Sequence, residues 1–125
     1  MQTQDFNRRL LEAIDEGLST LGESSKQAIY FHLEISFHVK KADIPRKIEE
    51  FAAAIEKIFG LGANFLEILI MRRLYEKVNG SFEWNEAKDL TFTEYVAAAK
   101  RSFLEKTAKA KTEELIDWQR ILTEG

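Results

Sequence analysis

The chain has 125 residues, with 18 basic and 21 acidic side chains, a formal net charge of −3 at pH 7 and no cysteine. This length can bury a core of its own, and the lack of cysteine excludes a disulfide framework, thiolate metal centres and a cysteine nucleophile, which favours a cytoplasmic protein. The acidic balance gives no overall attraction to nucleic acid, and no apolar run reaches the length that spans a bilayer, so we expect no membrane association.

A single proline, six glycines and many Ala, Leu, Ile, Glu and Lys residues favour helix along nearly the whole chain. We therefore predict an all-α fold: one domain over residues 1–125, formed by a compact bundle of five to six helices with its core at about residues 5–103. The first helix repeats apolar residues every three or four positions and ends at Gly22. That repeat consists of Phe6, Leu10, Ile14, Leu18 and Leu21.

The second predicted helix begins with Ser24 or Ser25 as its N-cap and runs to about Phe37. Its interior, AIYFHLEISF, is apolar on almost every side, which is typical of a central helix. We expect the core to contain Ala28, Ile29, Leu33 and Phe37, and we expect Phe31 and Ile35 to meet another element.

Asp43-Ile44-Pro45 separates the second helix from a third, because proline disfavours helical geometry in the residue before it. The third helix has an apolar face made of Ile48, Phe51, Ala52, Ile55, Ile58 and Phe59. Gly60-Leu61-Gly62 closes it and leads into a fourth helix, whose run FLEILIM is again apolar nearly all round. The second and fourth helices should therefore be central and face each other.

Residues 80–91 have no helical period, and we expect an ordered loop held by Trp84. Thr91 or Thr93 then caps a fifth helix, whose apolar positions are Phe92, Tyr95, Val96, Ala99 and Phe103. The polar stretch EKTAKAKTEE follows, before a last apolar group at the C-terminus. This stretch is either a solvated continuation of the fifth helix or a break before a sixth.

Several short motifs resemble a family of small archaeal domains, the Nitrosopumilus-type output domain of two-component signalling. They are Leu21-Gly22-Glu23-Ser24, Ala28-Ile29-Tyr30-Phe31-His32-Leu33-Glu34, Ile44-Pro45, Phe51, Ile55, Ile58-Phe59-Gly60 and Gly62-Ala63, within a match that covers roughly Leu10 to Phe103. The resemblance implies a helical module of undefined activity, found alone or attached to a receiver domain. This chain has no receiver domain, so it would act as a stand-alone signalling partner, and the family provides no catalytic residues.

No group of residues predicts catalysis, a cofactor or a metal. His32 and His38 lie about 240° apart around a helix and cannot converge on one ion. Gly60 and Gly62 precede a helix but lack the strand of a dinucleotide fold and the lysine of a phosphate loop, so a tight helix–helix turn is the better interpretation. Ser24 and Ser25 do not form a Ser-x-x-Lys motif with Lys26. We predict a protein that is not an enzyme.

Two groups of basic residues could attract nucleic acid. One surrounds Pro45 and consists of Lys40, Lys41, Arg46 and Lys47; the other lies on the fifth helix and consists of Lys100, Arg101, Lys106, Lys109 and Lys111. The second group could follow a nucleic-acid backbone, which makes a small nucleic-acid-binding regulator the alternative function. Because the chain is acidic overall, a solvated face is the favoured interpretation of both groups.

The C-terminal segment 104–122 carries Leu115, Trp118 and Leu122 at positions i, i+3 and i+7, which gives one apolar stripe. Tryptophan is a frequent centre of binding interfaces. The stripe either covers the chain's own bundle or docks on a second copy, and the second case predicts a homodimer with an isologous interface. Our leading hypothesis is a cytoplasmic, helical protein-interaction module with an unknown protein partner, which self-associates through this segment.

Overall fold

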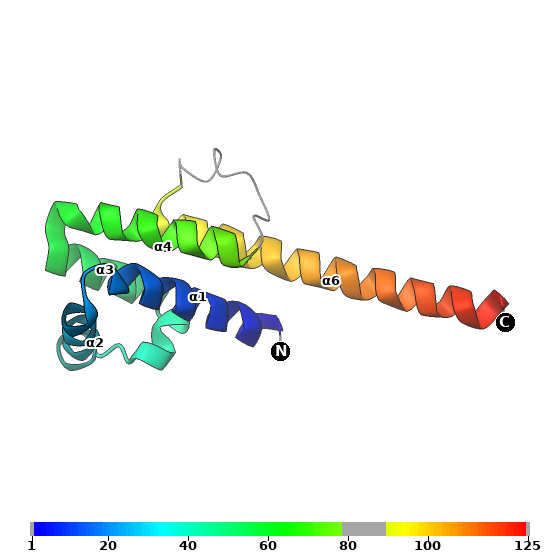
Figure 1. The fold of residues 1–125 in the computed structure, drawn as a ribbon, viewed down its shortest axis with the longest axis horizontal. Helices are drawn as coiled ribbons and strands as arrows, with labels where there is room; N and C mark the ends of the chain where they lie inside the picture. The colour runs from blue at the N-terminus through cyan, green and yellow to red at the C-terminus, as the bar shows by residue number, and fades with distance from the viewer. Residues whose placement is uncertain (1, 79–89, 125) are drawn as a thin grey trace.

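The computed structural model describes the backbone of residues 2–78 and 90–124 and the side chains of residues 2–78 and 90–109 (Figure 1). This part of the chain contains five α-helices, two short 3-10 helices and no strand, which confirms the predicted all-α class. The elements are α1 (Gln2–Ser19), α2 (Glu23–Phe37), η1 (Lys41–Arg46), α3 (Ile48–Phe59), η2 (Gly60–Gly62), α4 (Ala63–Lys77) and α6 (Phe92–Glu124).

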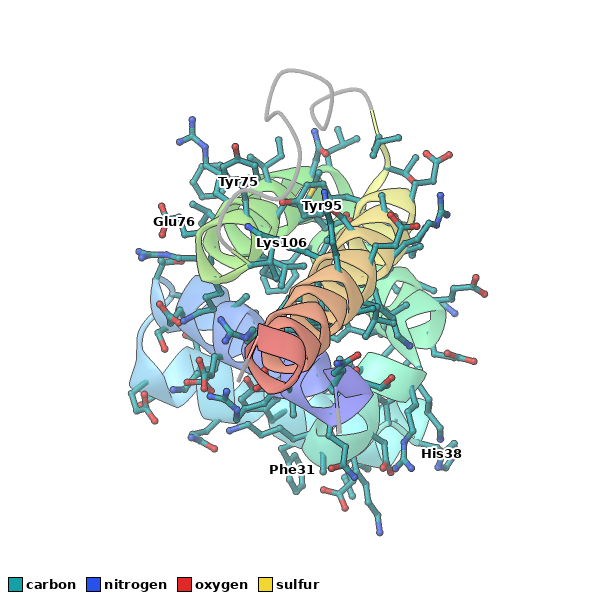
Figure 2. All side chains as sticks on the ribbon, turned by 90° about the vertical axis from the view of Figure 1, so that its right-hand side faces the viewer. Phe31, His38, Tyr75, Glu76, Tyr95 and Lys106 are labelled. Carbon is teal, nitrogen blue, oxygen red and sulfur yellow. The ribbon has the colours of Figure 1, made fainter. Side chains whose placement is uncertain are left out.

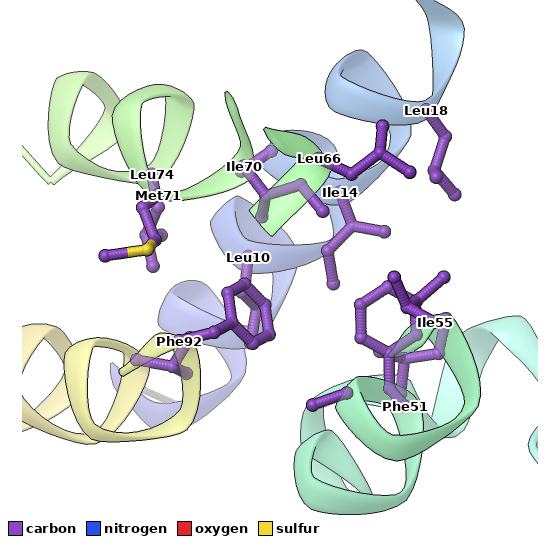
Figure 3. Packing of buried hydrophobic residues seen from close by; sticks show 14 of the residues in the cluster. Leu10, Ile14, Leu18, Phe51, Ile55, Leu66, Ile70, Met71, Leu74 and Phe92 are labelled. Atoms are coloured by element: carbon purple, nitrogen blue, oxygen red, sulfur yellow. The ribbon is translucent and has the colours of Figure 1, made fainter. Parts of the chain in front are cut away.

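Helix α1 is the centre of the bundle. It contacts α2, η1, α4 and α6, and its apolar stripe is buried at Phe6, Leu10, Ala13, Ile14 and Leu18. Its most extensive packing is against α4, where a Cβ atom on Gly17 would lie 2.7 Å from Cγ1 of Ile70. Glycine therefore permits a close approach of α1 to α4. Figure 3 shows the core that α1, α3, α4 and α6 enclose.

Helix α2 is peripheral, so the prediction that it is a central helix facing α4 is wrong. It packs against α1, α3 and η1, on the far side of α1 from α4 (Figures 1 and 2). Only one face of α2 is buried, at Lys26, Ile29, Tyr30 and Leu33. Ala28, Phe31 and Ile35 are exposed, whereas Phe37 is half-buried against the core. The outer face of α2 therefore carries two large apolar side chains, Phe31 and Ile35, that no described element covers.

Helix α4 occupies the central position that its apolar run predicts, since it contacts α1, α3 and α6. Its inner face is buried at Ala63, Leu66, Glu67, Ile70, Met71 and Leu74. The rest of the run faces outward, and Phe65 and Ile68 are exposed. An apolar run on nearly all sides of this helix thus belongs half to the core and half to the surface.

The helix ends agree only in part with the predicted caps. Ser24 and Ser25 lie inside the first turn of α2 and make no capping hydrogen bond, because the N-cap position is taken by Gly22. Thr91 caps α6 as one of the two predicted alternatives. Its Oγ1 accepts a hydrogen bond from the Glu94 amide at 3.3 Å, and Oε1 of Glu94 accepts one from the Thr91 amide at 2.9 Å. This reciprocal pair is a capping box.

Helix α6 is one continuous helix of 33 residues, about 50 Å long. Its first turns are buried at Phe92, Tyr95, Val96, Ala99 and Phe103, as predicted. The C-terminal half then runs past the N-terminus of α1 and away from the bundle, and no described element lies beside it (Figure 1). The polar stretch is therefore a continuation of the fifth helix. The predicted loop around Trp84 falls on residues 79–89, outside the described residues.

Three side chains hold α6 at the point where it leaves the bundle. The rings of Phe6 and Phe103 have centroids 5.8 Å apart, and the Arg9 guanidinium lies 5.4 Å from the Phe103 centroid. Nη1 of Arg9 also donates a hydrogen bond to the Lys77 carbonyl at the end of α4. Phe103 thus fixes α6 against α1, one residue before the half-buried Leu104.

Candidate interaction surfaces

A polar cluster joins α1, α2 and η1 around the carboxylate of Asp15. Lys26 Nζ lies 3.1 Å from Oδ2 of Asp15, and the Tyr30 hydroxyl donates a hydrogen bond of 3.0 Å to Oδ1. Lys41 Nζ lies 3.4 Å from the same Oδ1 and 4.8 Å from the centroid of the Tyr30 ring. Lys26 is buried, with 8% of its surface exposed, and also donates to the Ser19 hydroxyl.

The electrostatics of this cluster favour a structural role. Burial alone would raise the pKa of Asp15, but hydrogen bonds from Lys26 and Tyr30 hold it below its ordinary value. Hydrogen bonds to Glu23 and Asp15 raise the pKa of Lys26, and burial followed by the Asp15 carboxylate raises the pKa of Tyr30. Each group is therefore locked in its ordinary form at pH 7. A general acid or base needs the opposite, a pKa moved towards neutrality.

Beside this cluster, a surface hollow of about 280 Å³ is lined by Leu11, Glu12, Asp15, Glu16 and Lys41. Within the side chains that the structure describes, no three His, Cys, Asp or Glu residues are grouped so that they could hold a metal ion. His32 and His38 are both exposed. His32 contacts Ser36 at 3.1 Å and the edge of Phe37, whereas His38 ends α2 in the left-handed conformation. The two imidazoles therefore have separate surroundings.

The glycine turn between α3 and α4 is a helix junction. Gly60 follows α3 with φ of 58°, a conformation that suits glycine, and the short helix η2 continues directly into α4. Leu61 between the two glycines is fully exposed. This geometry agrees with the predicted tight turn.

Most basic residues around Pro45 have a local partner. Lys41 pairs with Asp15, Arg46 pairs with Asp43, and Lys47 Nζ donates to the His38 carbonyl at 3.3 Å. They therefore stabilise the segment that joins α2 to α3, and they offer fewer free charges to an external anion than the sequence suggests.

The basic residues of α6 are more open. Arg101, Lys106 and Lys109 are exposed and Lys100 is half-buried, whereas the side chain of Lys111 lies outside the described part. At 100° per residue these five positions are spread around the helix and form no single basic face. A helix that follows a phosphate backbone would need its charges on one side.

The predicted partner-binding residues all lie on the projecting part of α6. The helix is continuous through Leu115, Trp118 and Leu122, so their spacing places them on one face of its backbone. Their side chains lie outside the described residues. The predicted stripe therefore belongs to a segment of α6 whose backbone no described element of the bundle covers.

Two apolar groups are exposed in the structure. One lies on the outer face of α2, where Phe31 is 68% exposed and Ile35 60%, so the prediction that these two residues meet another element is wrong for the described part of the chain. Phe31 lies at the edge of the molecule, away from the other helices (Figure 2). The other extends from the turn before α4 into α4 itself and consists of Leu61, Phe65 and Ile68. The i, i+4, i+7 spacing of the second group could have revealed it, but such spacing is equally typical of a buried stripe.

Comparison of the chain with protein-family models, with curated proteins and with solved structures gives no match. Among the helices that the structure describes, none is both long enough and apolar enough to cross a bilayer. The fold and the surfaces above are therefore the basis on which a function can be assigned.

Proposed function

We propose that this protein is a non-enzymatic, helical protein-interaction module that self-associates through the part of α6 between Leu104 and Leu122. The observation that carries the proposal is the continuation of α6 beyond the bundle as a single helix (Figure 1). Most helical stability in proteins comes from packing of an apolar face, and no described element packs on this part of α6. A partner that covers the apolar stripe would therefore stabilise the projecting segment.

The apolar stripe gives this segment a surface on which a partner can pack. Leu115, Trp118 and Leu122 recur at helical spacing, and tryptophan often contributes most of the energy of an interface. A second copy of the chain brings the same stripe, and two-fold association is the commonest arrangement of soluble oligomers. The same segment thus serves as both binding face and ligand.

Two observations support a binding role over an enzymatic one and over nucleic-acid binding. The partly buried polar cluster around Asp15 has pKa values that move away from neutrality, which suits a structural contact. The basic positions of α6 are distributed around the helix, which favours a solvated rod over a nucleic-acid-binding face. The resemblance to archaeal output domains supports a place in signalling.

Sedimentation equilibrium of the intact chain tests the proposal. We expect the intact chain to form a dimer and a chain ending at Lys106 to be monomeric. Trp118→Ala should raise the dissociation constant of the dimer about 30-fold, because truncation of a central interface residue costs about 2 kcal/mol or more. Phe65→Ala is the matched control, because it removes an exposed aromatic ring at the other end of the molecule and should leave the dimer intact. An intact chain that is monomeric at all concentrations would refute self-association.

A further inference from the structure

We infer that the partner of α6 is a second copy of the same helix in antiparallel orientation, with the two-fold axis passing near residue 113. This inference rests on the proposed self-association and adds its direction and register. It follows from the continuity of α6, the spacing of residues along it and the distribution of charge between its two halves.

The two halves of the projecting helix carry opposite charge. Residues 104–111 contain three basic side chains and one acidic, and residues 113–122 contain three acidic and one basic. Antiparallel pairing lays the basic half of each copy along the acidic half of the other. Parallel pairing would instead place like charges together, which is unfavourable.

The spacing of the seam residues is symmetric about residue 113. Starting at Leu104, steps of four and three residues alternate, as in a coiled-coil repeat, through the positions Leu104, Ala108, Lys111, Leu115, Trp118 and Leu122. Reversing this series about residue 113 reproduces it. An antiparallel pair therefore brings every seam position of one helix level with a seam position of the other.

The layers that result combine residues of complementary size. Leu104 lies level with the partner's Leu122. Ala108, with a small side chain, lies level with the partner's Trp118, whose side chain is large. Lys111 lies level with the partner's Leu115, which is one position from the partner's Glu114. In this register the carboxylate of the partner's Glu114 can pair with the ammonium group of Lys111. In parallel pairing, Trp118 would meet its own copy and so would Lys111, which would put two cations in one layer.

The arrangement is also compatible with the bundle. Leu104 is half-buried at the edge of the core, so the seam begins where α6 leaves the other helices. The centre of the seam lies about 120° around α6 from the face that packs on the bundle. The overlap from residue 104 to residue 122 is about 27 Å long, and antiparallel pairing places the two bundles at its opposite ends.

Spin labels test the orientation directly, because the chain has no cysteine of its own. Arg101→Cys, at an exposed position, should give a label-to-label separation of about 36 Å along an antiparallel pair. Thr112→Cys, close to the two-fold axis, should give a separation near the interhelix distance of about 10 Å.

Each outcome is decisive when the labelled chains are also examined by sedimentation. A long distance at position 101 with a short one at position 112 supports the antiparallel pair. Short distances at both positions would overturn it in favour of parallel pairing, while the proposed self-association would stand. Labelled and unlabelled chains that are all monomeric would refute both.

Discussion

Replacing phenylalanine by alanine at two positions tests how the helices are arranged. Phe51 on α3 is completely buried, whereas Phe31 on α2 is 68% exposed. Phe51→Ala removes a full side chain from a packed core, which costs about 3–5 kcal/mol of unfolding free energy. Only about a third of the surface of Phe31 is buried, so removing its side chain costs about 0.5–1 kcal/mol of unfolding free energy. The higher helix propensity of alanine offsets about 0.5 kcal/mol of that cost. The predicted difference is about 3 kcal/mol.

Urea unfolding of the two variants, followed by circular dichroism at low protein concentration, measures this difference. The slope of the transition should stay unchanged, so that the midpoint reports stability alone. Equal destabilisation by Phe31→Ala and Phe51→Ala would refute the reasoning, because it would mean that the outer face of α2 is covered in the folded chain.

Three further substitutions test local features of the bundle. Burial, and secondly the Glu56 carboxylate, raises the pKa of Glu67, so the charged form of Glu67 opposes folding and stability falls as pH rises through that pKa. Glu67→Gln should therefore stabilise the fold at pH 7. In urea titrations this gain in stability should disappear below about pH 4, where Glu67 is protonated in the folded and the unfolded chain. Thr91→Ala removes the α6 capping box and should cost about 1 kcal/mol by the same assay, and no loss would contradict the cap. Gly17→Ala should cost about 1–2 kcal/mol because its Cβ would clash with Ile70, whereas Gly62→Ala, which meets only an atom at 3.9 Å, should be neutral or stabilising in thermal unfolding.

The sequence predicted the helices well where one face alone is apolar. The stripe of α1 as far as Leu18, the stripe of α3 and one of the two alternative caps, Thr91, follow from local spacing in the structure too. Leu21, the last residue of the predicted first stripe, lies beyond α1 and is exposed. Such features depend on neighbours within one or two turns of the same helix.

The position of α2 could not be predicted in this way, because its apolar residues allow two different buried faces. The structure buries the face with Lys26 and leaves Phe31 exposed. A lysine can be buried there because Asp15 and Ser19, which belong to α1, receive its hydrogen bonds. Only the crossing of α2 over α1 brings these partners together, so the choice between faces is made by tertiary contacts.

The candidate interface shows the same division. Spacing in the sequence was sufficient to find the stripe at Leu115, Trp118 and Leu122, but it left open whether the stripe covers its own bundle. The course of α6 beyond the bundle depends on where its Phe103 packs against Phe6 and Arg9 of α1, which is a tertiary contact.

The fluorescence of Trp118 as a function of protein concentration tests the central claim most directly. The chain has two tryptophans, so Trp84→Phe leaves Trp118 as the sole indole, and helical circular dichroism should confirm that this variant folds. The account predicts emission that shifts to shorter wavelength as concentration rises and the indole becomes buried between two copies of α6. Emission of a solvated indole at every concentration would contradict it.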